Sequence, residues 1–291
     1  MAAEQDIPDE PESGAGAKVA PRIVPVTTEL GPVRASITSG QPANAFVEYL
    51  LRLSDDRLVL GHRLSEWCGH APILEEDIAL ANIALDLIGQ ANAFYTIAAA
   101  AEGNGKTADD YAYFRDDVAF RNVMLVELPK GDFGVTIARL FLFSALQVPF
   151  LKALQGCSHA EVAGVAAKSY KESVYHLRHS AEWVLKLGDG TAESHARVQA
   201  AFDQLWPYHT ELFWQDGVDA AVQGQIGAPD LATLRAEWER TVQAVLSQAT
   251  LTVPTSEWQP TGGRLGRHTE HLGHMLAEMQ SVARAHPGAS W

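Results

Sequence analysis

The sequence predicts an all-α protein built as a helical bundle. Over several long segments, apolar residues return every three to four positions, which is the period of a helix that buries one face. No segment shows the sustained alternation of apolar and polar residues that indicates a half-buried strand, and no repeat of fixed length is present. Several amphipathic helices in one chain pack most simply as a bundle around a common core.

The first two long helices are expected at 45–67 and 75–101. In the first, apolar residues from Phe46 to Trp67 follow one stripe. The second opens with three acidic residues, which are favourable at the positive end of a helix dipole. It is then apolar almost all round, as a central helix is, and Gly103 is placed to end it.

The next two long helices are expected at 133–155 and 158–187. Asp132 is of a residue type that caps a helix and precedes the first of them. Ser158 and Glu161 have the spacing of a capping box at the start of the second.

Shorter helices complete the predicted fold. We expect one or two of them at 109–127, one at 192–214 with a kink at Pro207, one at 231–250 and a last one at 269–285.

The sequence divides into two parts of different composition. Residues 1–43 are rich in Pro, Gly, Ala and acids and have no sustained apolar period, so they are expected to form a disordered or loosely attached extension. Residues 44–291 are expected to form the helical domain.

Composition excludes several classes of protein. The net charge of −14 argues against a nucleic-acid binder, which needs a basic face. No apolar run reaches ~18 residues, so neither a membrane span nor a membrane partner is expected. The acidic, proline-containing N-terminus is unlike a secretory signal. Cys68 and Cys157 are expected to be buried free thiols in a reducing compartment, and we expect a cytoplasmic protein.

One segment has the residue types of a metal site. Glu172 and His176 are four residues apart and leave the fourth long helix on one face. A di-metal centre in a four-helix bundle takes a carboxylate and a histidine three residues later from each of two helices. Here Tyr175 stands where that histidine should be.

The other helices complete the comparison with a di-metal centre. Glu66 and Asp86 are candidate carboxylates, but Gly89 stands three residues after Asp86, and 133–160 contains no Asp or Glu. Glu66, Asp86, Glu172 and His176 are therefore ligand-like positions that do not complete a di-iron site.

Two interpretations of these four positions remain open. One is a buried hydrogen-bonded network, because carboxylates in a dry core need partners. The available partners are Arg57, Arg63, Arg139, Arg178 and Tyr175. The other is a single metal ion held by His176 and one or two carboxylates.

A second cluster lies near the C-terminus. His268, His271 and His274 have a spacing at which helical histidines can chelate zinc, and Glu270 is close by. Gly273 weakens the helix that would carry them, so capping or interface contacts are the alternative.

Several motifs together resemble one known family. They are LSEWCGHAP at 64–72, ANIALDLIGQA at 81–91, KESVYHLR at 171–178, and HTEHLG with LAEMQ at 268–280. In this order, over about 45–291, the chain resembles the PaaC family, the structural subunit of the phenylacetyl-CoA epoxidase complex of aerobic phenylacetate degradation.

This resemblance implies a ferritin-like fold and an assembly with other subunits. The partner would be a paralogous subunit whose di-iron site oxygenates the aromatic ring of phenylacetyl-CoA, supplied with electrons from NADPH by a reductase with FAD and an iron–sulfur cluster. The resemblance implies no catalytic, cofactor-binding or metal-binding residue in this chain. The alternative is a ferritin-like di-iron or mononuclear oxidase that acts alone through Glu66, Asp86, Glu172 and His176.

Overall fold

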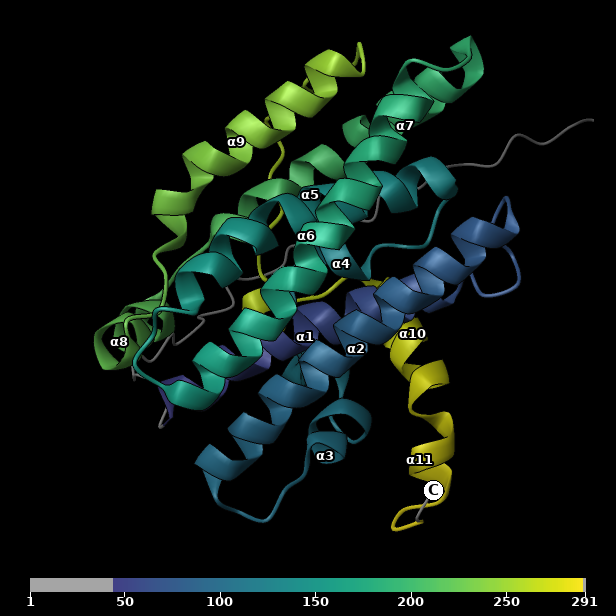
Figure 1. The fold of residues 1–291 in the computed structure, drawn as a ribbon. Helices are drawn as coiled ribbons and strands as arrows, with labels where there is room; N and C mark the ends of the chain where they lie inside the picture. Colours follow the sequence, from purple (N-terminus) through teal and green to yellow (C-terminus); the bar gives the residue numbers. More distant parts are fainter. Residues whose placement is uncertain (1–43, 290–291) are drawn as a thin grey trace, which may run out of the picture. The chain divides into compact units, whose positions relative to one another are not determined.

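The structure, a computed structural model, describes residues 44–289, and every regular element in this range is a helix (Figure 1). The α-helices are α1 (Ala45–Ser65), α2 (Leu74–Glu102), α3 (Ala108–Tyr113), α4 (Met124–Glu127), α5 (Phe133–Leu154), α6 (Ala160–Gly188), α7 (Ala192–Leu205), α8 (Gly217–Ile226), α9 (Leu231–Gln248), α10 (Glu270–Met279) and α11 (Ser281–Ala285). Three short 3-10 helices are η1 (Asp117–Ala119), η2 (Trp206–Phe213) and η3 (Gly263–Leu265). The all-α prediction is confirmed. The predicted extension, 1–43, lies outside the described residues.

Four long helices form a ferritin-like bundle. α1 packs along α2, α5 packs along α6, and α2 also contacts α6. In Figure 1, α2 and α6 lie side by side in front of α1 and α5. The additional helices cover the bundle from outside: α7 and α9 pack on α5, and α8 packs on α1. The bundle interior is therefore the space that α1, α2, α5 and α6 enclose.

Local sequence signals set most of the helix ends. The side chain of Asn44 accepts a hydrogen bond from the Val47 N–H at 3.1 Å, and Asp132 accepts one from the Val135 N–H at 2.9 Å. Gly103 ends α2 in the left-handed conformation, with φ 66°. The predicted starts and stops of α1, α2, α5 and α9 hold to within one to three residues.

Some predicted elements were wrong in detail. The N-cap of α6 is His159 rather than Ser158, whose N–H instead donates to the Ile226 carbonyl at 2.7 Å. The helix expected at 192–214 is α7 followed by the 3-10 helix η2, which carries Pro207 in its first turn. Helix α8 was missed.

The last predicted helix is also divided. α10 ends at Met279 and α11 begins at Ser281, with Gln280 between them. The Gln280 side-chain amide donates to the carbonyls of Ala112 and Arg115 at 3.0 and 2.9 Å, so a tertiary contact fixes the point of the break.

Within residues 44–289, two helices are long and apolar enough, by length and composition alone, to cross a membrane: α2 and α5. In the bundle, 94% of the apolar window of α5 is buried, but only 50% of that of α2. α5 thus places its apolar surface in the core, while half of α2 faces outward. Of the two thiols, Cys157 is buried as predicted, whereas Cys68 is exposed because it lies in the turn after α1.

Candidate functional site

A chain of hydrogen bonds crosses the bundle interior, with Arg57 of α1 at its centre. Its guanidinium donates from Nε to Oε1 of Gln90 on α2 at 3.0 Å and from Nη2 to Oε1 of Gln147 on α5 at 2.6 Å. Its third donor, Nη1, reaches the Leu53 carbonyl at 2.8 Å. The Gln90 amide then donates to Oε2 of Glu172 on α6 at 2.9 Å. Each of the four bundle helices therefore contributes one side chain.

The Arg57 guanidinium is a fixed cation in this interior. Its side chain is fully buried, and its Cζ lies 5.1 Å from the centre of the Phe94 ring. Burial lowers the pKa of Arg57 to about 10, although the neighbouring Asp56 carboxylate opposes the shift. The side chain is therefore charged at neutral pH. Its charge is dispersed over amide and carbonyl oxygens, which are the acceptors that a dry site can provide.

The four ligand-like positions do not converge as a di-metal site requires. Glu66 is exposed at the end of α1 and pairs with Arg63 at 2.6 Å. Asp86 is half-buried, and its Oδ2 lies 3.1 Å from Nε2 of the buried His176. Glu172 belongs to the Arg57 chain. The expectation that all four are buried holds only for His176: Glu66 is exposed, and Asp86 and Glu172 are half-buried, because their helix positions leave part of each carboxylate open to solvent.

The predicted partners of these positions are also largely different. Arg63 does pair with Glu66, but Arg57 binds amides, and Arg139 donates to the backbone carbonyls of the α4–α5 turn. Tyr175, which stands in the histidine place of the ligand motif, is 44% exposed and turns away from the interior. Among the four ligand-like positions themselves, the one direct pair between two helices is Asp86 with His176.

The residues of this interior do not fit a di-iron centre. Among residues 44–289, no three His, Cys, Asp or Glu side chains gather so that they could hold a metal ion. The single carboxylate of the chain of hydrogen bonds, Glu172, already accepts from Gln90, and the Arg57 charge lies in the same interior. A cation there would meet a guanidinium and amide groups rather than the four carboxylates and two histidines of such a centre.

The histidine cluster near the C-terminus is not brought together as a chelate. His268 precedes α10, and its Nδ1 lies 2.7 Å from Oε2 of Glu127 while its Nε2 lies 3.0 Å from the Phe120 carbonyl. Both ring nitrogens therefore have acceptors, which favours the protonated ring. Burial alone lowers the pKa of His268, but the hydrogen bond and charge of Glu127 outweigh it, and the pKa is raised. His274 is exposed and is not gathered with His268 and His271 into a group that could hold a metal ion, so the zinc interpretation has no support in the geometry of residues 44–289.

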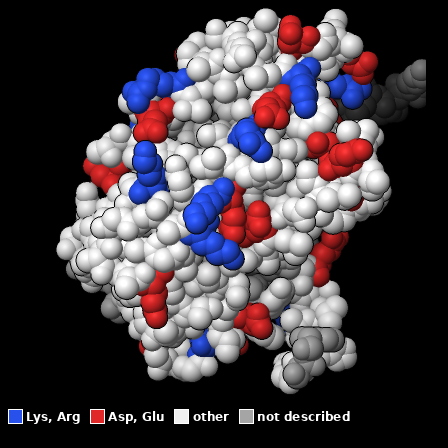
Figure 2. All heavy atoms as spheres, viewed as in Figure 1, with Lys and Arg blue, Asp and Glu red and all other residues white. Residues whose placement is uncertain are grey.

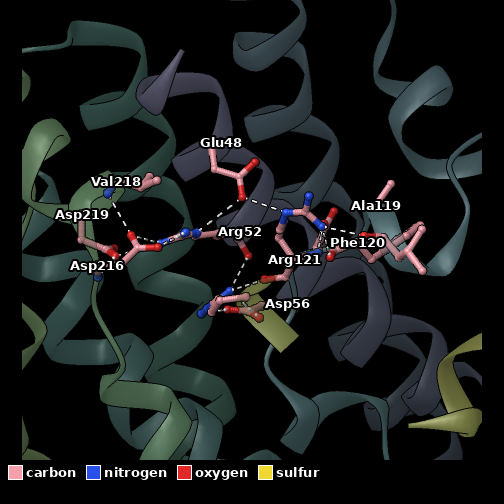
Figure 3. Close-up of polar contacts among 12 residues, drawn as sticks. Glu48, Arg52, Asp56, Ala119, Phe120, Arg121, Asp216, Val218 and Asp219 are labelled. Atoms are coloured by element: carbon pink, nitrogen blue, oxygen red, sulfur yellow. Dashed lines mark hydrogen bonds and ion pairs between the residues drawn. The ribbon is translucent and has the colours of Figure 1, made fainter. Parts of the chain in front are cut away.

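A second network, which the sequence reasoning missed, ties α1 to the C-terminal helices (Figure 3). Arg52 donates to Asp216 at 2.8 and 3.0 Å and to Asp219 at 2.8 Å, at the start of α8. Asp56 accepts from Arg264 of η3 at 2.7 and 3.0 Å. The signal was present as the charged residues Arg52, Asp55, Asp56 and Arg57, which are close together in the middle of α1 between apolar positions. Their partners could not be read from it.

A third buried anchor uses backbone donors. Glu211 is 1% exposed, and its two oxygens accept from the N–H groups of Met124, Gly262 and Gly263, each at 2.7 Å. Burial raises the pKa of Glu211, while these N–H groups oppose the shift. This carboxylate fixes the loop before α10 against the start of α4, and its contacts are structural.

The fold and its interior define the class: a ferritin-like helical-bundle protein whose centre is occupied by an arginine, two glutamines and one glutamate. A model of the family described as "Phenylacetic acid catabolic protein" matches residues 35–291. The chain is also 47% identical over 248 residues to the 1,2-phenylacetyl-CoA epoxidase subunit designated C of Escherichia coli (strain K12), an alignment that covers 85% of this chain and 100% of that protein. The chain belongs to the phenylacetic acid catabolic protein family.

Proposed function

We propose that this chain is the structural subunit of a multicomponent phenylacetyl-CoA epoxidase. In this proposal a paralogous partner carries the di-iron site that oxygenates the aromatic ring, and a separate reductase supplies electrons from NADPH through FAD and an iron–sulfur cluster. The chain acts by packing against its partner in the complex. We expect this assembly to be cytoplasmic.

The observation that carries the proposal is the Arg57 chain of hydrogen bonds. It fills the space enclosed by α1, α2, α5 and α6 with residues that bind each other, and all three guanidinium nitrogens of Arg57 and both polar atoms of the Gln90 side chain have partners. An interior of this kind serves stability and shape. The identity to the Escherichia coli relative over its whole length supports membership of such a complex, because that relative is named as one subunit of an epoxidase.

A binding role has a direct thermodynamic consequence. A protein that binds only the folded partner stabilises it by RT ln(1 + [L]/Kd), which is about 2.7 kcal/mol when its free concentration is 100 times Kd. We therefore expect the catalytic partner to be less stable and less soluble when it is produced without this chain.

The test measures iron and turnover in parallel. The chain is purified alone and co-expressed with its catalytic partner, and each sample is assayed for iron and for epoxidation of phenylacetyl-CoA. We expect near-stoichiometric iron and turnover only in the complex. Iron bound tightly by the isolated chain would instead favour an oxidase that acts alone.

A matched pair of variants separates structure from chemistry. Glu172→Gln keeps an oxygen that accepts from the Gln90 amide but removes the charge that a metal would need. His176→Gln keeps an N–H donor for the Asp86 carboxylate but removes the imidazole that a metal would bind. We expect both variant complexes to assemble with unchanged iron content and turnover within about threefold of wild type. Loss of iron or of turnover in an assembled Glu172→Gln complex would show that Glu172 has a role in the chemistry.

A further inference from the structure

Charged side chains on the surface of the bundle are mixed in sign. Figure 2, viewed as in Figure 1, shows positive and negative groups interspersed over this face. On α6 the exposed side-chain nitrogens of Lys168 and Arg178 lie 3.7 and 3.9 Å from the carboxylates of Glu172 and Glu182 on the same helix. These charges largely compensate one another and select no partner. Buried polar groups without a protein partner, in contrast, occur inside residues 44–289.

A small cavity is bordered by α1, α5 and α8. It has a volume of about 30 Å³. The polar residues that line it include Arg52 and Asp56 of α1, Gln147 of α5 and Asp219 of α8. Gln147 belongs to the Arg57 chain of hydrogen bonds, whereas the other three belong to the network shown in Figure 3. The cavity therefore lies between the two polar networks of the protein.

Tyr49 of α1 also lines this cavity, and its hydroxyl forms no hydrogen bond with any group of residues 44–289. The residue is only 4% exposed. Burial raises the pKa of Tyr49, and the nearby Asp219 carboxylate raises it further, so the phenol is neutral and retains its proton to donate. A buried hydroxyl without a hydrogen bond costs stability. Tyr49 therefore needs a partner that the described part of the chain does not supply.

Two further residues of the cavity wall have hydrogen-bonding capacity that the protein leaves unused. Gln147 accepts from Arg57 through Oε1, while its amide nitrogen donates to no group among the described residues. Asp219 accepts through Oδ2 from Nη1 of Arg52 and from the Asp216 N–H, at 2.8 and 3.0 Å. Its other oxygen, Oδ1, accepts no hydrogen bond from residues 44–289. The wall thus offers a hydroxyl, an amide donor and a carboxylate acceptor.

The volume of the cavity and the chemistry of its wall together identify the ligand. Sites for drug-sized molecules have volumes of about 300–1,000 Å³, so this cavity is roughly ten times too small for one. A water molecule needs at least about 10–15 Å³ and two to four polar partners. Water can accept from the Tyr49 hydroxyl and the Gln147 amide while it donates to the Asp219 carboxylate. Both the volume and the polar groups therefore fit water.

We propose that this cavity is a water-binding site, in which a buried water joins Tyr49, Gln147 and Asp219. The water extends the Arg57 chain of hydrogen bonds from the bundle interior to the ion pair of Arg52 and Asp219 at the start of α8. The docking of α8 on α1 then depends on a bound molecule as well as on the direct ion pair. This inference is independent of the proposed function.

Two measurements on the purified chain test the site. A high-resolution crystal structure is expected to show an ordered water within about 3.2 Å of the Tyr49 hydroxyl and of either Nε2 of Gln147 or Oδ1 of Asp219. The second measurement is the melting temperature of Tyr49→Phe. This variant keeps the ring and removes the hydroxyl with its hydrogen bond to the water, so the melting temperature should fall by about 2–4 °C.

Two other tyrosines provide matched controls for the loss of one hydroxyl. The buried Tyr95 hydroxyl bonds directly to Asp55 and Arg115, so Tyr95→Phe should lower the melting temperature by at least as much as Tyr49→Phe. The Tyr175 side chain is 44% exposed, so Tyr175→Phe should change the melting temperature by less than about 2 °C. Tyr49→Phe is expected to behave like the first control and not like the second.

Either measurement can overturn the proposal. Electron density without an ordered water beside the Tyr49 hydroxyl would show that the cavity is dry. A melting temperature of Tyr49→Phe equal to or above that of wild type would show that the hydroxyl has no hydrogen bond to lose. The physical reason is that removing a buried hydroxyl without a partner relieves its desolvation cost, which stabilises the folded protein.

Discussion

Replacing Arg57 by methionine tests whether the interior chain of hydrogen bonds works as a unit. The change removes a fully buried guanidinium and leaves the side-chain oxygens of Gln90 and Gln147 without their donor. Each unsatisfied buried group costs about 1–3 kcal/mol, and breaking a buried charged network by removing one member costs about 3–5 kcal/mol. We expect Arg57→Met to lower the free energy of unfolding by about 3–5 kcal/mol, or the melting temperature by roughly 6–20 °C.

The decisive comparison replaces the whole network. Arg57→Met combined with Gln90→Met and Gln147→Met removes the charge and both orphaned amides together, while the partly exposed Glu172 keeps Lys168 nearby, with Nζ and Oε1 3.7 Å apart. Because burying the charge is itself costly, this triple variant should recover most of the loss. Urea unfolding followed by circular dichroism gives both free energies.

Arg178→Met, on the exposed side of α6, is the control. Its free energy of unfolding is expected to lie within about 0.5 kcal/mol of the wild-type value. A triple variant less stable than Arg57→Met alone would refute the reasoning, because the amides would then contribute independently of the arginine.

Two further perturbations test the anchors outside the bundle interior. Gly263→Ala should lower the free energy of unfolding by at least about 2 kcal/mol in the same assay, because its Cβ would lie 2.2 Å from the Asn122 carbonyl oxygen. The control, Gly164→Ala, lies in open space on α6 and should raise the free energy of unfolding by about 0.5–1 kcal/mol. Equal effects would show that the close approach at Gly263 is unimportant. The raised pKa of His268 means that its pair with Glu127 contributes stability fully below pH ~6.5, its unfolded value, and loses it as pH rises through the folded value. Wild type should therefore lose stability relative to His268→Asn as pH rises above ~6.5, and parallel pH profiles would contradict this.

Much of the fold could be predicted because its signals are local. The stripe of α1, the capping residue Asp132 and the left-handed Gly103 each act within a few residues, and all three hold in the structure. The failures occurred where a distant contact decides the outcome. Ser158 loses its capping role to a contact with the end of α8, and Gln280 breaks the last helix because its amide reaches α3 and the turn after it.

The candidate site was only partly predictable for the same reason. The residue types of a ligand set could be read from Glu172 and His176, and the missing histidine at Tyr175 weakened that interpretation without any structure. The hydrogen bonds of Arg57 to Gln90 and Gln147 could not be predicted from the sequence, because these two residues are 33 and 90 positions away from Arg57.

The helices and the incomplete metal motif could be read from the spacing of residues along the chain, and the quoted motifs carried the resemblance to one family. Which polar side chains face inward depended on how the helices pack. Helices can be rotated and shifted against each other without any change in their own periodicity, so the register of α1, α2, α5 and α6 determines their interior. That register turns Arg57 into the bundle and leaves Leu85 and Tyr175 on its surface.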